Sequence, residues 1–157
     1  MPSPSLTALA AAVLHVRDLP ERILEVGCGD GEGVLFLARE FPAARVRGVD
    51  SSAEAIRDAV ARVGLDPEGR VAFKQAKRGG LPYPDAFFDL VAQTGGGLRP
   101  RELARVLRPG GHLILVGRWR WSDWRLAKHG FDPLGSEEVE GERFQVLRLH
   151  PARTAGD

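Results

Sequence analysis

The chain has 157 residues, and its 22 basic and 21 acidic side chains leave a net charge of +1. This length and a hydrophobic content of 43% suit one domain with one core over residues 1–157. The lone cysteine, Cys28, excludes an intramolecular disulfide and favours a reducing, cytoplasmic location. Asn is absent and arginine far outnumbers lysine, a composition found in thermophiles but also in proteins of GC-rich genomes.

The first 20 residues predict a helix. Leu6, Leu9, Val13 and Val16 follow one another at steps of three, four and three, as on the buried stripe of a helix. A signal peptide is not expected, because the segment lacks a basic start and contains His15. No stretch approaches the ~20 apolar residues of a membrane helix, so no membrane partner is predicted.

The most informative segment is a predicted strand over residues 22–26 followed by glycines at alternate positions. Gly27, Gly29 and Gly31 permit a sharp turn, and helical spacing resumes from about residue 31 to 40. Such a turn brings unpaired N–H groups of a helix to a polar ligand. A dinucleotide fingerprint would require glycine where this chain has Glu32, which disfavours a nicotinamide-dependent oxidoreductase.

A second strand, predicted over residues 45–50, ends on Asp50. The distance from the turn fits a carboxylate that accepts hydrogen bonds from ribose hydroxyls. Ser51 and Glu54 form an S-x-x-E pattern that predicts the cap of a helix over 52–63, with Gly64 at its end. On this interpretation Asp50 is free for a ligand.

The rest of the chain continues the alternation of strands and helices. We expect strands at 71–75, 88–93 and 112–117, a helix begun by Pro100, a short helix near 122–129, and an antiparallel pair around 134–139 and 143–149. This order predicts a parallel sheet with helices on both faces. Ligands bind such sheets at the carboxyl ends of the strands, where the glycine turn, Asp50 and Gln93 would converge.

Four segments in order resemble class I S-adenosylmethionine-dependent methyltransferases. They are Glu25-Val-Gly-Cys-Gly-Asp-Gly31, Leu81-Pro-Tyr-Pro-Asp-Ala-Phe-Phe-Asp-Leu-Val91, the Arg101-to-Gly111 block with its Pro-Gly-Gly, and His112-Leu-Ile-Leu-Val116. The resemblance implies a compact, doubly wound, mostly parallel seven-stranded sheet of order 3-2-1-4-5-7-6 with an antiparallel C-terminal strand. It also implies a cofactor-binding core at 22–116, a substrate-side helix and strand pair at 117–150, and a tail at 151–157.

The same resemblance implies the cofactor S-adenosylmethionine, with S-adenosylhomocysteine as its product. In that family an acidic residue and the glycine backbone hold the methionine end, and a second acid holds the ribose. Carried onto this chain, the expected cofactor-binding residues are Glu25, Gly27, Cys28, Gly29, Gly31, Asp50, Ser51, Lys77, Arg78 and Gln93. Cys28 is expected to be a small, fitting residue more than a reactive thiol.

The chain departs from the family in the adenine region. Lys77 stands where an Asp or Glu usually accepts a hydrogen bond from the adenine amino group, and lysine only donates. Ser51 replaces a residue that is commonly apolar. One lost hydrogen bond would cost roughly 1–3 kcal/mol, which predicts weakened cofactor binding. The alternative function is therefore a weak or inactive methyltransferase-like interaction module.

On the acceptor side the candidates are Thr94, Arg118, Trp119 and Trp121. Between residues 99 and 128 eight basic residues stand against two acidic ones, and three tryptophans interleave with arginines. On one interpretation these side chains bind an aromatic or anionic acceptor, nucleic acid included. On the other, the tryptophans close the core and the arginines are solvated. The sequence predicts a small-molecule acceptor or one that it does not identify. No catalytic residue is assigned, although His15, His112 and His129 are possible bases, and no metal site is predicted.

Overall fold

The computed structural model describes residues 3–77, 80–117 and 122–151. Within these ranges the chain alternates between strands and helices, as the sequence predicted. The elements are α1 (Pro4–Val13), β1 (Arg22–Val26), α2 (Glu32–Glu40), β2 (Arg45–Asp50), α3 (Ala53–Val63), β3 (Val71–Gln75), β4 (Phe88–Gln93), α4 (Pro100–Val106), β5 (Leu107–Val116), α5 (Ser122–Lys128), β6 (Phe131–Val139) and β7 (Glu142–Leu149).

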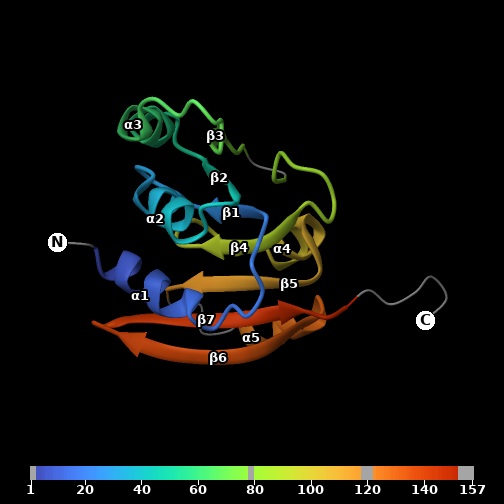
Figure 1. The fold of residues 1–157 in the computed structure, drawn as a ribbon. Helices are drawn as coiled ribbons and strands as arrows, with labels where there is room; N and C mark the ends of the chain where they lie inside the picture. The colour runs from blue at the N-terminus through green and yellow to red at the C-terminus, as the bar shows by residue number, and fades with distance from the viewer. Residues whose placement is uncertain (1–2, 78–79, 118–121, 152–157) are drawn as a thin grey trace.

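The strands form one sheet of order β3-β2-β1-β4-β5-β7-β6, visible from top to bottom in Figure 1. The first five strands are parallel, and β7 is antiparallel to both β5 and β6. This is the predicted doubly wound arrangement. The order reverses between β1 and β4, so the carboxyl ends of these strands flank the place where such folds bind ligands.

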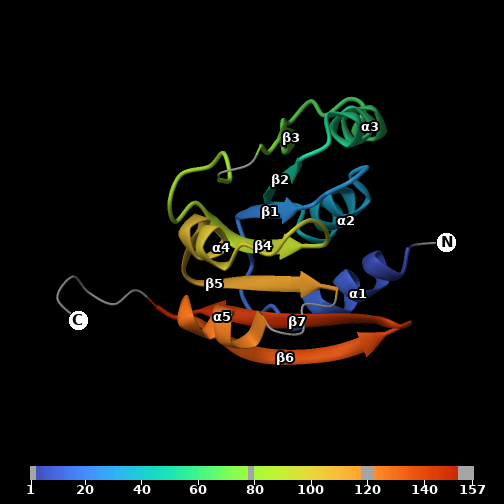
Figure 2. The same cartoon turned by 180° about the vertical axis from the view of Figure 1, so that it is seen from behind.

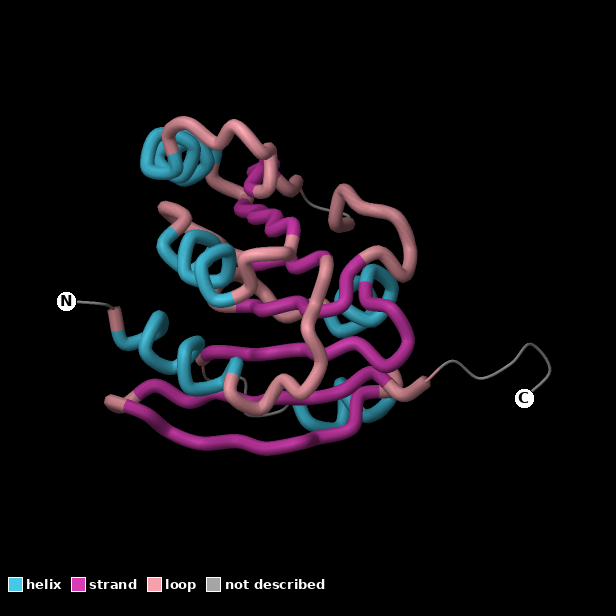
Figure 3. The backbone as a smooth tube through the Cα atoms, in the orientation of Figure 1, coloured by secondary structure: helices cyan, strands magenta, loops and turns pink. Residues whose placement is uncertain are grey.

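Helices cover both faces of the sheet. The helices α1 and α2 pack on one face over Ile23, Val46 and Leu90, while α4 and α5 pack on the other over Leu24, Val91 and Leu113 (Figures 1 and 2). Successive residues of the buried strands therefore serve opposite cores, which explains why these strands are apolar almost throughout. The loop between α1 and β1 crosses the N-terminal parts of β4 and β5 (Figure 3).

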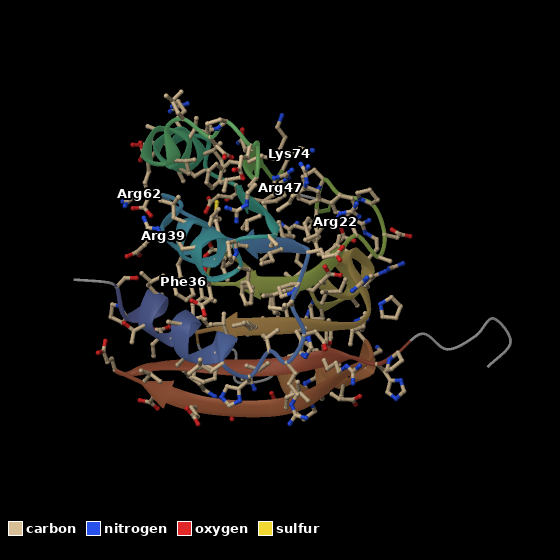
Figure 4. All side chains as sticks on the ribbon, in the orientation of Figure 1. Arg22, Phe36, Arg39, Arg47, Arg62 and Lys74 are labelled. Atoms are coloured by element: carbon tan, nitrogen blue, oxygen red, sulfur yellow. The ribbon has the colours of Figure 1, made fainter. Side chains whose placement is uncertain are left out.

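The strands β1, β2 and β3 carry cationic side chains on one face. Arg22, Arg47 and Lys74 lie on the same side by register and project near one another in Figure 4. Two of them sit over aromatic rings: the Arg22 guanidinium carbon is 4.4 Å from the centroid of the Phe87 ring, and the Lys74 ammonium is 5.0 Å from that of Tyr83. The loop that carries these rings thus covers this part of the sheet.

Four local predictions need correction. The N-terminal helix covers Pro4–Val13 and not the first 20 residues, so Val16 lies beyond its end. The cap of α3 is Ser52, whose hydroxyl accepts from the Ala55 amide, and not Ser51. The strand β5 begins at Leu107 instead of 112, because Leu107 pairs with Phe88 before a register shift that absorbs the Pro-Gly-Gly segment. Trp124 does not close the core, since it is 65% exposed.

Candidate functional site

The turn between β1 and α2 is shaped by glycines that adopt positive φ angles. These angles are 74° at Gly27, 53° at Gly29 and 87° at Gly31. The amides of Gly27 and Cys28 both donate to the Val49 carbonyl, which ties the turn to the end of β2. A side chain at position 27 would collide with the Gly95 backbone, so glycine is required there for packing as well as for its φ angle.

Glu25 is buried beneath this turn with only 2% of its surface exposed. Its Oε2 lies 2.5 Å from the Thr94 hydroxyl, and its Oε1 has no hydrogen-bond partner. Gly33 leaves the necessary space, because a Cβ there would lie 2.5 Å from Oε2. Burial, reinforced by the neighbouring acids, raises the pKa of Glu25 to about 8, although the Thr94 hydrogen bond acts in the opposite direction.

The Thr94 hydroxyl lies within hydrogen-bond distance of two acceptor oxygens. It lies 3.2 Å from the Gly27 carbonyl oxygen in addition to its contact with Glu25. The hydroxyl carries one proton, and the shorter of the two contacts, to Glu25, is the one that lowers the Glu25 pKa. Burial is therefore the main cause of the raised Glu25 pKa.

Asp50 stands at the end of β2, half-buried, beside the glycine turn. One carboxylate oxygen accepts from the Gly29 amide at 3.0 Å and the other accepts from the Ser52 amide at 3.0 Å. The sequence had suggested a carboxylate free for a ligand, but in the structure Asp50 already accepts from two backbone amides. These two bonds leave lone pairs on both oxygens and fix the orientation of the group.

Two adjacent pockets open at this edge of the sheet, and Gly27 lines both. One, of about 190 Å³, brings Asp50, Ser51 and Gln93 together with Leu81 and Arg99. The other, of about 160 Å³, is bordered by Glu25, Cys28, Thr94 and the first turn of α1. Backbone atoms of Gly27 and Gly95 meet at the boundary between them.

The remaining sequence candidates fall into three groups. Ser51 is exposed and lines the larger pocket, whereas Lys77 is exposed and borders neither pocket. Burial raises the pKa of the Cys28 thiol to about 12, with Glu25 and Asp50 adding to the effect, which agrees with a fitting residue and not a reactive one. The other candidates lie outside the described residues: Arg78, Arg118, Trp119 and Trp121.

Two contacts that support the site escaped the sequence analysis. The Ser3 hydroxyl donates to Glu32 at 2.9 Å and thereby holds α1 against the turn. Arg105 donates to the carbonyls of Leu81 and Tyr83 and to Glu102, which anchors the 81–87 loop beside the larger pocket. Only the Glu102–Arg105 pair has a local spacing, at i,i+3 on α4; the contacts to Glu32, Leu81 and Tyr83 join residues 29, 24 and 22 positions apart.

Contacts also reach the turn from α3. Arg62, labelled in Figure 4, donates to Asp30 at 2.6 Å and so ties α3 to the turn.

The four histidines are all described, and none of them lines the two pockets. Among residues 3–77, 80–117 and 122–151 there is no group of three or more His, Cys, Asp or Glu side chains that could hold a metal ion. In the same ranges no helix is long and apolar enough to cross a membrane.

Comparison with known proteins identifies the family of this chain. A sequence profile of the family described as "Methyltransferase domain" matches residues 23–111. The chain is 39% identical over 138 residues to a fatty-acid O-methyltransferase of Mycolicibacterium smegmatis, covering 82% of this chain and 49% of that protein. It is 38% identical over 118 residues to the 27-O-demethylrifamycin SV methyltransferase of Amycolatopsis mediterranei, covering 70% and 43%. The chain thus spans about half the length of these relatives or less.

Solved structures match the fold. A SAM-dependent methyltransferase from Aquifex aeolicus superposes with a TM-score of 0.71 at 21% identity, covering 94% of both chains. The sheet order and the glycine turn define a class I methyltransferase fold. The chain belongs to the S-adenosylmethionine-dependent methyltransferase family, and the cofactor is S-adenosylmethionine.

Proposed function

We propose that this domain binds S-adenosylmethionine across the two adjacent pockets and transfers the methyl group to a small-molecule acceptor. The observation that carries the proposal is the placement of two carboxyl groups in different environments, one in each of the two pockets that Gly27 lines. Asp50, held by backbone amides in the larger pocket, suits the ribose hydroxyls. Glu25, buried with a free oxygen beside the smaller pocket, suits the methionine ammonium.

The chemistry asks little more of the protein. The sulfonium group of the cofactor is already a strong electrophile, so holding a nucleophile in line with the methyl group accounts for much of the catalysis. Thr94 and the first turn of α1 border the pocket where the methionine end would lie, and we place the acceptor on this side. The names of the two relatives support a small-molecule acceptor.

Other functions are less well supported. A nucleic-acid acceptor would use the basic region after residue 99, but Arg105 is engaged by Glu102 and Asp85, and Arg108 by Asp89. An inactive interaction module would have no need of a buried acid with an unpartnered oxygen beside a pocket, since such a group is costly to the fold.

Calorimetric titration with S-adenosylhomocysteine tests the proposal. We expect saturable binding, and a loss of about 10- to 100-fold in affinity for Asp50→Asn, because a neutral amide replaces a charged acceptor. The matched control is Asp58→Asn on the exposed side of α3, which should bind like the wild type. Ligand at 100 times its dissociation constant should add about 2.7 kcal/mol to the stability of the folded protein. Silence up to millimolar ligand would refute the proposal.

A further inference from the structure

Gln93, the last residue of β4, is a buried amide with one unused end. Only 1% of its surface is exposed. Its Nε2 donates to the Gly95 carbonyl at 3.1 Å and to the Gly97 carbonyl at 2.9 Å. Carbonyl oxygens only accept, so these two bonds fix which end of the amide is nitrogen. The other end, Oε1, is buried and has no hydrogen-bond partner.

This unpartnered oxygen belongs to a residue that lines the larger pocket. The same pocket is bordered by Asp50 and Ser51 at the end of β2 and by Ala76 after β3. A buried acceptor without a donor is unfavourable, and native proteins retain few of them. Gln93 therefore holds a buried acceptor without a donor at the wall of this pocket.

The cofactor offers a small set of hydrogen-bond donors. They are the methionine ammonium, the two ribose hydroxyls and the adenine 6-amino group. Under the proposed function, Glu25 takes the ammonium at the smaller pocket and Asp50 takes the hydroxyls at the larger one. The remaining donor is the 6-amino group, and Gln93 Oε1 is the buried acceptor without a partner in the pocket that also holds Asp50.

Other side chains near the expected adenine position are unsuited to this task. Lys77 only donates, is exposed, and does not line the pocket. Glu102 is already occupied by the Leu81 amide and by Arg105, and Asp85 is exposed, pairs with Arg105 and does not line the pocket. None of these side chains can replace the carboxylate that the family resemblance leads one to expect after β3.

We propose that the amide oxygen of Gln93 accepts the hydrogen bond from the adenine 6-amino group and thereby supplies the adenine specificity of this domain. The inference rests on the proposed function, because it requires that the cofactor occupies the larger pocket. On this proposal the acceptor for the 6-amino group comes from the end of β4 and not from the loop after β3. A neutral amide held by two loop carbonyls performs the role of the missing carboxylate.

The test compares two ligands on the same protein. S-adenosylhomocysteine and its analogue with hydrogen in place of the 6-amino group are titrated into the wild type, Gln93→Met and Lys77→Met. We expect the wild type and Lys77→Met to prefer S-adenosylhomocysteine by about 10-fold or more. Gln93→Met should bind the two ligands within about threefold of each other, because methionine keeps the length of the side chain and removes the acceptor.

The ratio of the two affinities separates this inference from other effects. Loosening of the 94–97 loop by Gln93→Met would weaken both ligands together and leave their ratio unchanged. Equal binding of both ligands by the wild type would overturn the inference and leave the proposed function intact, whether or not the variant folds. A preference that survives in Gln93→Met would also overturn it. Failure of the wild type to bind either ligand would instead overturn the proposed function.

Discussion

Replacement of Glu25 by glutamine should make the protein more stable at neutral pH. The buried carboxyl has a pKa of about 8 in the folded protein, against 4.5 for the unperturbed group. Between these values the unfolded chain releases a proton that the folded protein keeps, so stability falls as the pH rises and levels off above 8. Glutamine has nearly the same shape and no such proton, so the variant escapes this loss.

The magnitude follows from the shift in the Glu25 pKa. At about 1.36 kcal/mol for each pKa unit, the wild type should lose roughly 4 kcal/mol relative to Glu25→Gln between pH 4.5 and 8. For a chain of this length, that corresponds to a relative change in melting temperature of about 8–16 °C. Urea denaturation at pH 4.5, 6, 7 and 8 measures the difference. The control is Glu68→Gln, at an exposed loop position.

The same reasoning couples cofactor binding to a proton. If the methionine ammonium pairs with Glu25, the carboxyl must ionise on binding, so affinity for S-adenosylhomocysteine should rise about tenfold per pH unit below 8. Calorimetry in buffers of different ionisation enthalpy should detect about one proton released at pH 7, and none with Glu25→Gln. For the stability prediction, urea midpoints of the wild type and of Glu25→Gln that shift equally with pH would refute the raised pKa of Glu25.

Three further predictions concern the surroundings of the site. Alanine normally stabilises a helix relative to glycine, but Gly33→Ala in α2 should destabilise the protein by about 1–3 kcal/mol in urea denaturation, because its Cβ meets the Glu25 carboxyl. Gly97→Ala, whose Cβ meets nothing within 4 Å, should change stability little. Arg105→Met should cost about 1.5–3 kcal/mol and speed proteolytic cleavage within residues 81–87, and unchanged cleavage would contradict the anchoring role. The Cys28 thiol should react at least about 100-fold more slowly with a thiol reagent at pH 8 in the native protein than in urea, and equal rates would contradict its burial.

Local signals in the sequence were sufficient for the elements and for the turn. Apolar strands, helical spacing and the glycines at 27, 29 and 31 depend on neighbours close in the chain, so their structural consequences are visible without the fold. The same signals placed the end of β2 at Asp50, beside the turn. Predictions that depended on one local pattern were less secure, because Ser51 and Ser52 match a capping position almost equally and the hydrogen bond from the Ala55 amide to Ser52 distinguishes them.

The protonation state of Glu25 and the orientation of Gln93 were decided by tertiary contacts. Thr94 lies 69 positions from Glu25, and Gly33 leaves space for its carboxyl from another element. The sequence identified Gln93 as a candidate because it ends a predicted strand, and Glu25 because it matches the acidic residue of the family motif. Burial and hydrogen bonding depend on how the strands and loops meet, and these contacts raise the pKa of one acid and leave one amide oxygen without a partner.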